Sequence, residues 1–355
     1  MWLDHQKIGR EDPGMHLIPR SRTDITLRLA AAMFAVVTLV AACGSNLDDG
    51  AAGTDTDAKV SYNFAMGSSG AAGAFYQAAM ERNDAKHGYD GKWVELTGSE
   101  VAVSGIAANK FQFGAGVAAT VMAAQQEQEA PLTFIGDFMR MFWTLTAKTT
   151  INSCQDLDGV RFALHSPGGV STAIFKSWFA KNCPTSVKPK IMYVEGSPNR
   201  LQGLLAGQID ATMLEVDDTL DLPADKFKIM VNFGDQLPEI EANTVYANNT
   251  FLKEHPDVAI GLLSEMSALA KEVNADPSLF AGLIKKYKPE LAERADEIAK
   301  AYVDGGLFAE DGAMSMADLQ KTVDLYQTAG AIKPGLRAEK IANREYLEKA
   351  LQPAG

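Results

Sequence analysis

Two glycine- and serine-rich segments carry the groups best suited to bind an anion. Each follows an apolar run that predicts a strand, and each opens a stretch with helical spacing. Backbone amides, hydroxyls and the positive end of a helix dipole form an anion site at such a junction, although Ser and Gly are also ordinary helix caps. Ligands of open α/β sheets bind at the carboxyl ends of strands, so two such turns favour one shared site. The first turn offers Ser68, Ser69 and Gly70, and the second offers Ser166, Gly168, Gly169, Ser171 and Thr172.

A third glycine-containing turn has the spacing of a dinucleotide-binding fingerprint. Residues 114–119 (GAGVAA) match G-x-G-x-x-A after a predicted strand, and Asp137 follows about 20 residues later. This spacing would suit an NAD(P)-dependent enzyme. This strand-turn-helix unit is, however, the third in its lobe rather than the first. An exported chain also has no evident supply of nicotinamide cofactor. An ordinary tight turn is one alternative, and a cleft lining without nucleotide is another, with Gly114, Gly116 and Asp137 as candidate ligand contacts.

Charged and aromatic residues near other predicted strand ends add candidate contacts. Glu215, Asp217 and Asp218 could bind a cationic or amino group of a ligand or a metal, or they could be solvated or cap a helix. Arg140 could pair with a ligand carboxylate or sulfonate, or it could lie on the surface. Tyr76, Phe138 and Trp143 could line an aromatic wall, or each could pack in the core.

Motifs for metal or nucleophilic catalysis are missing from the sequence. Beyond the first 43 residues the histidines are His87, His165 and His255, and none belongs to an H-E-x-x-H motif. The chain has no C-x-x-C pair and no G-x-S-x-G elbow. We therefore expect a binding protein rather than an enzyme, with no cofactor and no metal.

Short apolar runs that alternate with helical stretches predict an α/β fold. Such strands pair in parallel, with helices on both faces of the sheet. The polar stretch 148–158 separates two series of runs, which predicts two similar α/β lobes. After the last strand the chain reads as helical, with prolines near helix starts and glycines at helix ends. The predicted strands are residues 60–65, 92–96, 111–113, 132–135, 160–165, 190–194, 211–216, 227–233 and 244–247.

Residues 15–43 have the character of a lipoprotein export signal. Three arginines precede the apolar run 29–42, which ends in small residues before Cys43. The run is shorter than the roughly 20 apolar residues that span a bilayer. We expect residues 1–42 to be removed, with Met15 a possible true start, and Cys43 to be lipidated on the outer face of the membrane. An ordinary secretory signal and an uncut apolar anchor are the alternatives.

The mature chain is expected to be acidic, with a tether before its folded part. Removing residues 1–42 takes five Lys or Arg and four Asp or Glu from totals of 33 and 45, which leaves a net charge of about −13. An acidic surface repels phosphate backbones, so nucleic acid is not an expected partner. Residues 43–57 are small, polar and acidic, which indicates a flexible tether.

Cys154 and Cys183 are the cysteines that remain after lipidation of Cys43. Cys154 precedes a predicted strand, and Cys183 ends the helix that follows it. The helix of a strand-helix unit runs back to the edge where the strand began, so the two thiols could meet there. In an oxidising exterior we expect a disulfide, which would contribute about 3 kcal/mol; two unconnected buried thiols are the alternative.

Several segments, in their order along the chain, resemble solute-binding proteins of the nitrate, sulfonate and taurine type. The first lobe carries the resemblance in residues 98–101 (GSEV), 107–114 (AANKFQFG) and 123–126 (AAQQ). The second carries it in residues 154–160 (CQDLDGV), 166–169 (SPGG) and 204–211 (LLAGQIDA), and residues 249–257 (NTFLKEHPD) complete it. These proteins are related in fold to thiamine-pyrimidine precursor binders. The resemblance covers nearly all of residues 58–290.

This resemblance implies a periplasmic-binding-protein type II fold that closes on a small molecule and delivers it to the permease of an ABC importer. One lobe would comprise residues 58–146 and 244–355, and the other residues 147–243, with two crossovers as the hinge. The expected ligand is a small organic anion such as a sulfonate, carboxylate or aromatic acid. An aromatic, pyrimidine or amino-bearing ligand is the alternative, and the protein is expected to act as a monomer.

Overall fold

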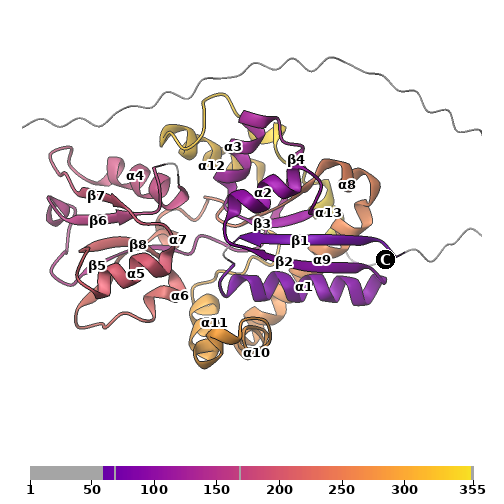
Figure 1. Cartoon of the computed structure of the whole chain (residues 1–355), viewed down its shortest axis with the longest axis horizontal. Helices are drawn as coiled ribbons and strands as arrows, with labels where there is room; N and C mark the ends of the chain where they lie inside the picture. The colour runs from indigo at the N-terminus through magenta and orange to yellow at the C-terminus, as the bar shows by residue number, and fades with distance from the viewer. Residues whose placement is uncertain (1–58, 68, 168, 353–355) are drawn as a thin grey trace, which may run out of the picture. The chain divides into compact units, whose positions relative to one another are not determined.

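Two five-stranded sheets organise the chain, one in each lobe (Figure 1). The computed structural model describes residues 59–67, 69–167 and 169–352. The first sheet has the strand order β2-β1-β3-β10-β4, and the second has the order β7-β6-β8-β5-β9. The strands are β1 (Ser61–Gly67), β2 (Asp90–Leu96), β3 (Phe113–Gly116), β4 (Leu132–Asp137), β5 (Trp143–Lys148), β6 (Arg161–Leu164), β7 (Lys190–Tyr193), β8 (Ala211–Glu215), β9 (Phe227–Asn232) and β10 (Thr244–Asn248).

Several sequence predictions fall outside the described residues. These are the export signal, the lipidation site Cys43, the tether up to residue 57, and the turn residues Ser68 and Gly168. Within the part of the chain that is described, no helix has both the length and the apolar character needed to cross a bilayer.

Each sheet contains one antiparallel strand next to its parallel strands. β10 runs antiparallel to β3 and β4, and β5 runs antiparallel to β8 and β9. The chain leaves each lobe at the edge of the sheet where the parallel strands end, and it enters the other lobe at the same kind of edge. The first strand after a crossing therefore runs antiparallel to the other strands of its sheet. The prediction of purely parallel sheets was therefore wrong, and β5 was not predicted. Because β5 belongs to the second sheet, that sheet begins at Trp143, before the predicted boundary at residue 147.

Helices cover both faces of the first sheet. Phe64 and Met66 of β1 pack in one core with α1, whereas Ala65 packs in a second core with α2 and α3 (Figure 1). This alternation follows from the two-residue period of a strand. In the second sheet, Ala163 and Leu214 form a smaller core with α5. The helices of this part are α1 (Ala72–His87), α2 (Ser99–Ala107), α3 (Ala118–Gln128), η1 (Gln155–Leu157), α4 (Val170–Asn182), α5 (Ser197–Leu205), α6 (Val216–Thr219) and α7 (Phe233–Gln236).

The chain after β10 is helical, as predicted. Asn248, Asp276 and Ser315 cap three of its helices through side-chain oxygens that accept backbone N–H groups. Residues 289–304 form a 3-10 turn followed by an α-helix. The elements are α8 (Asn249–Glu254), α9 (Pro256–Ala275), α10 (Pro277–Tyr287), η2 (Pro289–Arg294), α11 (Ala295–Asp304), α12 (Met316–Thr328), η3 (Ala338–Lys340) and α13 (Glu345–Ala350).

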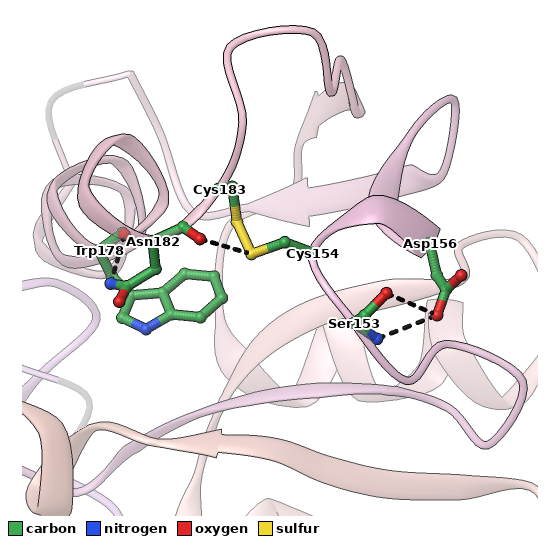
Figure 2. The surroundings of a disulfide bond; sticks show 6 residues. All are labelled: Ser153, Cys154, Asp156, Trp178, Asn182 and Cys183. Atoms are coloured by element: carbon green, nitrogen blue, oxygen red, sulfur yellow. Dashed lines mark hydrogen bonds between the residues drawn. A yellow bond between two sulfur atoms is a disulfide. The ribbon is translucent and has the colours of Figure 1, made fainter.

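A disulfide joins Cys154 to Cys183, whose Cα atoms are 5.3 Å apart. Figure 2 shows it beside the last turn of α4, where Asn182 Nδ2 donates to the carbonyl of Trp178 (2.8 Å). On the other side, Asp156 accepts the backbone N–H of Ser153 (3.0 Å). The pairing agrees with the topological prediction, because α4 does return to the edge at which β6 begins.

A buried carboxylate links the two segments that cross between the lobes. The first crossing segment lies between β4 and β5, and the second lies between β9 and β10. One oxygen of Asp137 accepts the N–H of Met139 in the first crossing (3.0 Å), and the other accepts the N–H of Asn243 in the second (3.3 Å). The backbone N–H of Glu241 donates to Thr322 Oγ1 of α12 (2.9 Å). Burial raises the pKa of Asp137, and burial with the nearby Asp137 charge raises the pKa of Glu241. Glu241 is therefore the protonated partner of the two at neutral pH.

Candidate functional site

A buried ion pair fixes the turn that follows β1. Lys288 is only 3% exposed, its Nζ donates to Ser69 Oγ (2.7 Å), and it pairs with Glu95. Ser69 Oγ in turn donates to Glu95 Oε1 (2.9 Å). Burial opposes ionisation of Glu95, but hydrogen bonds from Lys288 and Ser69 lower its pKa. The hydroxyl proton of Ser69 is thus used within the protein, and this predicted ligand residue holds the turn in place.

The same turn approaches the second lobe at Gly70. This glycine has a φ of +49°, which favours glycine, and a Cβ added to it would lie 3.7 Å from Asp217 Oδ2 on α6. Arg294 makes further contacts there: its Nη1 pairs with Asp221 (2.6 Å), and its Nη2 donates to the carbonyl of Asp217 (3.4 Å). The turn after β1 and the turn after β8 therefore lie close together, although one belongs to each lobe.

Three carboxyl groups gather at the end of β8. Burial, followed by the charges of Asp217 and Asp218, raises the pKa of Glu215 well above its ordinary value. Burial and the charge of Asp218 raise the pKa of Asp217 to about 6. Asp218 also has a raised pKa because of burial, although a hydrogen bond from Ser197 works against the shift. All three side chains keep partial solvent exposure, and such a crowded site would be stabilised by a cationic or amino group.

Two buried tyrosines of the first lobe differ in their acidic neighbours: Tyr302 lies near these acids, and Tyr76 lies near Asp137. Tyr302 of α11 is 2% exposed, and burial together with the charges of Asp217 and Glu215 raises its pKa. Tyr76 of α1 is fully buried, and its hydroxyl donates to the carbonyl of Asn243 (3.2 Å). Both phenols stay protonated, so Tyr302 brings a hydrogen-bonding group without charge to the acidic cluster, whereas the hydroxyl of Tyr76 is used at the second crossing.

Arg200 of α5 lies at the same edge and was not predicted as a site residue. It is 0% exposed, and it donates through Nε to the carbonyl of Met213 (2.9 Å) and through Nη1 to that of Val194 (3.0 Å). Burial lowers its pKa to about 10, against the charges of Glu215 and Asp218. Positions 197, 200, 201 and 204 form one face of α5 and all four are buried, but the sequence alone shows only that Arg200 shares this face with Leu201 and Leu204.

The second predicted anion turn lies at the start of α4. Gly169 is the N-cap residue of α4, and its N–H donates to the carbonyl of Ser166 (3.1 Å). Ser171 and Thr172 are 1% and 0% exposed, and their hydroxyls have no hydrogen-bond partner within the described chain. Both hydroxyls are therefore buried within the protein, and neither is used by a neighbour among the described residues.

Other predicted contacts serve the core and the crossings. Gly114 lies within β3, where a Cβ would approach Ile106 and Tyr246 to less than 3 Å, so close packing explains this glycine. Gly116 has a φ of +150° directly before α3. Asp137 is occupied by the crossing segments, and Phe138 is fully buried in the core. These placements give the dinucleotide hypothesis no cradle for a pyrophosphate and no free acid for a ribose.

Arg140 lies beside two hollows of the surface, and Val216 of the turn after β8 lines the smaller of them with it. It is exposed, and it lines a cavity of about 120 Å³ together with Phe142, Thr144 and Asn232, and a more open hollow of about 510 Å³. Both hollows adjoin the first crossing segment. The structure thus places Gly70 near the turn that begins at Glu215, and Arg140 lines the smaller hollow together with Val216 of the same turn. Among the described His, Cys, Asp and Glu side chains, no group of three or more is arranged to hold a metal ion.

Comparison with protein families and known structures gives a consistent result. The NMT1/THI5-like family model matches residues 85–278, which is more than half of the chain. A search of curated proteins finds no match. The fold is similar to that of a zinc-bound ligand-binding component of an ABC-type import system from Staphylococcus aureus, with a TM-score of 0.68 and 11% identity over 82% of this chain and 99% of that one.

Two further structures show how widely this fold is shared. The periplasmic aliphatic sulphonate binding protein of Escherichia coli has a TM-score of 0.63 and 14% identity, covering 79% of this chain and 91% of that one. A desulfurization enzyme has a TM-score of 0.60 and 10% identity, covering 82% of this chain and all of that one. The two-lobed periplasmic-binding-protein fold predicted from the sequence is therefore confirmed.

Proposed function

The chain belongs to the NMT1/THI5-like family, and from this membership we propose that it is the extracytoplasmic substrate-binding component of an ABC importer. Two of the structures that share its fold are named as a ligand-binding component of such a system and as a sulphonate-binding protein. The observation that carries the proposal is the meeting of turns from both lobes at Gly70 and Asp217, beside buried ionisable groups with few partners.

A hinge between the lobes would let this site open and close. Both crossing segments are short enough to act as hinges, and the Asp137 carboxylate bonds the backbone of each. The Arg294 ion pair with Asp221 joins the lobes beside the site and could break on opening. A ligand enclosed there would contact both lobes, so binding would favour the closed state.

The proposed ligand is a small organic anion, such as a sulfonate, a carboxylate or an aromatic acid. Support comes from the strand-to-helix turns, whose backbone amides suit an anion. A second candidate, a ligand with an amino group, is favoured by the raised pKa values of Glu215 and Asp217, because a cation would offset their mutual repulsion.

We propose binding without turnover. The chain lacks the catalytic motifs of metal and nucleophilic enzymes, but the same fold occurs in a desulfurization enzyme. Purified protein incubated with a bound ligand should return that ligand unchanged, and it should bind NAD or NADP no better than background. Release of a product, or cofactor affinity lost on Asp137 substitution, would support an enzyme instead.

The proposed anchor is a lipid on Cys43. A pair of acyl chains gives stable attachment to a bilayer. Cys43→Ser should leave folding unchanged and move the protein from the membrane fraction to the soluble fraction. A variant that stays in the membrane fraction would show that another segment provides the attachment.

A thermal-shift screen of the purified domain tests the binding role directly. The panel should contain small anions, sulfonates, aromatic acids, pyrimidines and amines. A ligand at 100 times its Kd that binds only the folded state adds about 2.7 kcal/mol of stability. The absence of any shift across all classes would count against the role of a binding protein.

A further inference from the structure

Two buried hydrogen-bond donors lie side by side at the ligand edge of the second sheet. Arg200 is 0% exposed and its Nη2 has no acceptor among the described residues, while Trp143 is 7% exposed and its indole Nε1 also lacks one there. The guanidinium carbon is 5.7 Å from the centre of the Trp143 ring. Buried polar atoms nearly always have partners, so two adjacent donors without an acceptor point to a group that is yet to bind.

The position of this pair places it at the proposed site. Val194 and Met213, whose carbonyls Arg200 holds, lie just after β7 and near the end of β8. Trp143 opens β5 and pairs in register with Glu215. The pKa of His165, at the end of β6, is lowered by burial and then by the charge of Arg200. Arg200 therefore lies next to the carboxyl ends of the parallel strands β6, β7 and β8.

The hydrogen bonds of Arg200 indicate what kind of ligand group would complete them. Backbone carbonyls fix two of its nitrogens, so the side chain is oriented but its charge is not paired by a hydrogen-bonded carboxylate among the described residues. Glu215 and Asp218 act on it only through their charges. A guanidinium presents its N–H groups in a planar fork that suits a carboxylate or sulfonate, and an indole N–H can only donate.

We propose that Arg200 Nη2 and Trp143 Nε1 form a binding subsite for one oxyanion group of the ligand, either a carboxylate or a sulfonate. The inference rests on the proposed binding function and adds to it the contact that selects an anion. It places that contact on a side chain of α5 rather than on the α4 hydroxyls of Ser171 and Thr172. The acids after β8 then face the remainder of the ligand.

The sharpest test removes one donor and keeps the packing. Trp143→Phe retains an aromatic ring but lacks the indole N–H, and Trp178→Phe is its control, since Trp178 is a buried indole of the same lobe (8% exposed) that packs on Phe233. Arg200→Lys keeps the charge and loses the fork. Melting temperature and near-ultraviolet circular dichroism should first show that each variant is folded.

Calorimetry with benzoate, benzenesulfonate and benzylamine gives the readout. Trp143→Phe should lower the affinity for both anions about tenfold, and Arg200→Lys should lower it up to about a hundredfold, because hydrogen bonds to a charged group are lost. Trp178→Phe should bind them like the wild type, and benzylamine should not respond to Trp143→Phe. Unchanged anion affinity in both Trp143→Phe and Arg200→Lys, or a wild type that binds neither anion, would overturn the subsite. If another ligand from the thermal screen still bound, the binding role itself would survive that result.

Discussion

Lys288 in the first lobe and Arg200 in the second are both buried cations, and they differ in their partners. Lys288 is hydrogen-bonded to Ser69 and paired with Glu95, so its charge and the adjacent hydroxyl are satisfied within the protein. Among the described residues, the hydrogen bonds of Arg200 go to backbone carbonyls and its guanidinium lies over the Trp143 ring, while Glu215 and Asp218 act on it by charge. A satisfied network holds a turn in shape, whereas an unsatisfied one can be completed by a ligand.

The same contrast applies to the carboxylates. Glu95 has a lowered pKa because donors surround it, while Asp217 has a raised pKa because burial and Asp218 oppose its ionisation. Proteins retain such strained groups where function requires them, and perturbed acids therefore mark candidate sites. We infer that the first lobe supplies a rigid wall and the second lobe supplies most of the electrostatic selectivity.

The largest predicted effect comes from breaking the satisfied network. Lys288→Met should lower the free energy of unfolding by about 2 to 3 kcal/mol, because Ser69 and the partly exposed Glu95 both lose their donor. Urea unfolding gives the value. Lys286→Met is the matched control two residues away, since Lys286 is exposed and pairs with Glu81 on the surface. Equal losses in the two variants would show that Lys288 does not hold the turn.

A smaller effect is expected at the crossings. Asp137→Asn should cost about 2 kcal/mol, because both carboxylate oxygens accept backbone N–H groups and an amide can accept at only one of them. Glu241→Gln should cost less, since its raised pKa keeps Glu241 neutral like the amide that replaces it. Thermal unfolding at pH 7 compares the two. A larger loss in Glu241→Gln would mean that this side chain, and not Asp137, links the crossings.

The smallest effect should have the opposite sign. Asp217→Asn should stabilise the ligand-free protein by about 1 kcal/mol at pH 7.5, because burial and the charge of Asp218 oppose the ionised Asp217 and an amide carries no charge. The folded pKa of Asp217 is raised from 3.8 to about 6, so the wild type keeps its full stability below pH 4 and loses part of it as the pH rises through 6. Melting temperatures of the two proteins should therefore converge near pH 4. A variant that is less stable than the wild type at pH 7.5 would contradict this account of the acids.

The sequence by itself determined the α/β class, the two lobes and most strands, because apolar runs and turn residues are local signals. The cysteine pairing also followed from local order, since a helix that returns along its strand brings Cys154 and Cys183 together. Membership of the binding-protein class could be anticipated from short degenerate segments in a consistent order. Gly70 and Glu215 were predicted as ligand contacts, and the structure places them in neighbouring turns.

Only the tertiary structure decided which polar groups are already satisfied. Ser69 and Asp137 were reasonable ligand contacts in the sequence, but distant residues occupy them, namely Lys288 and Asn243. β5 escaped prediction because a strand that crosses between lobes pairs with neighbours far along the chain. Arg200 was overlooked for the same reason: its burial, its two carbonyl partners and its position beside Trp143 come from elements that meet only after folding. Hydrogen-bond partners distant in sequence leave no local pattern, so the chemistry of the site depended on the fold.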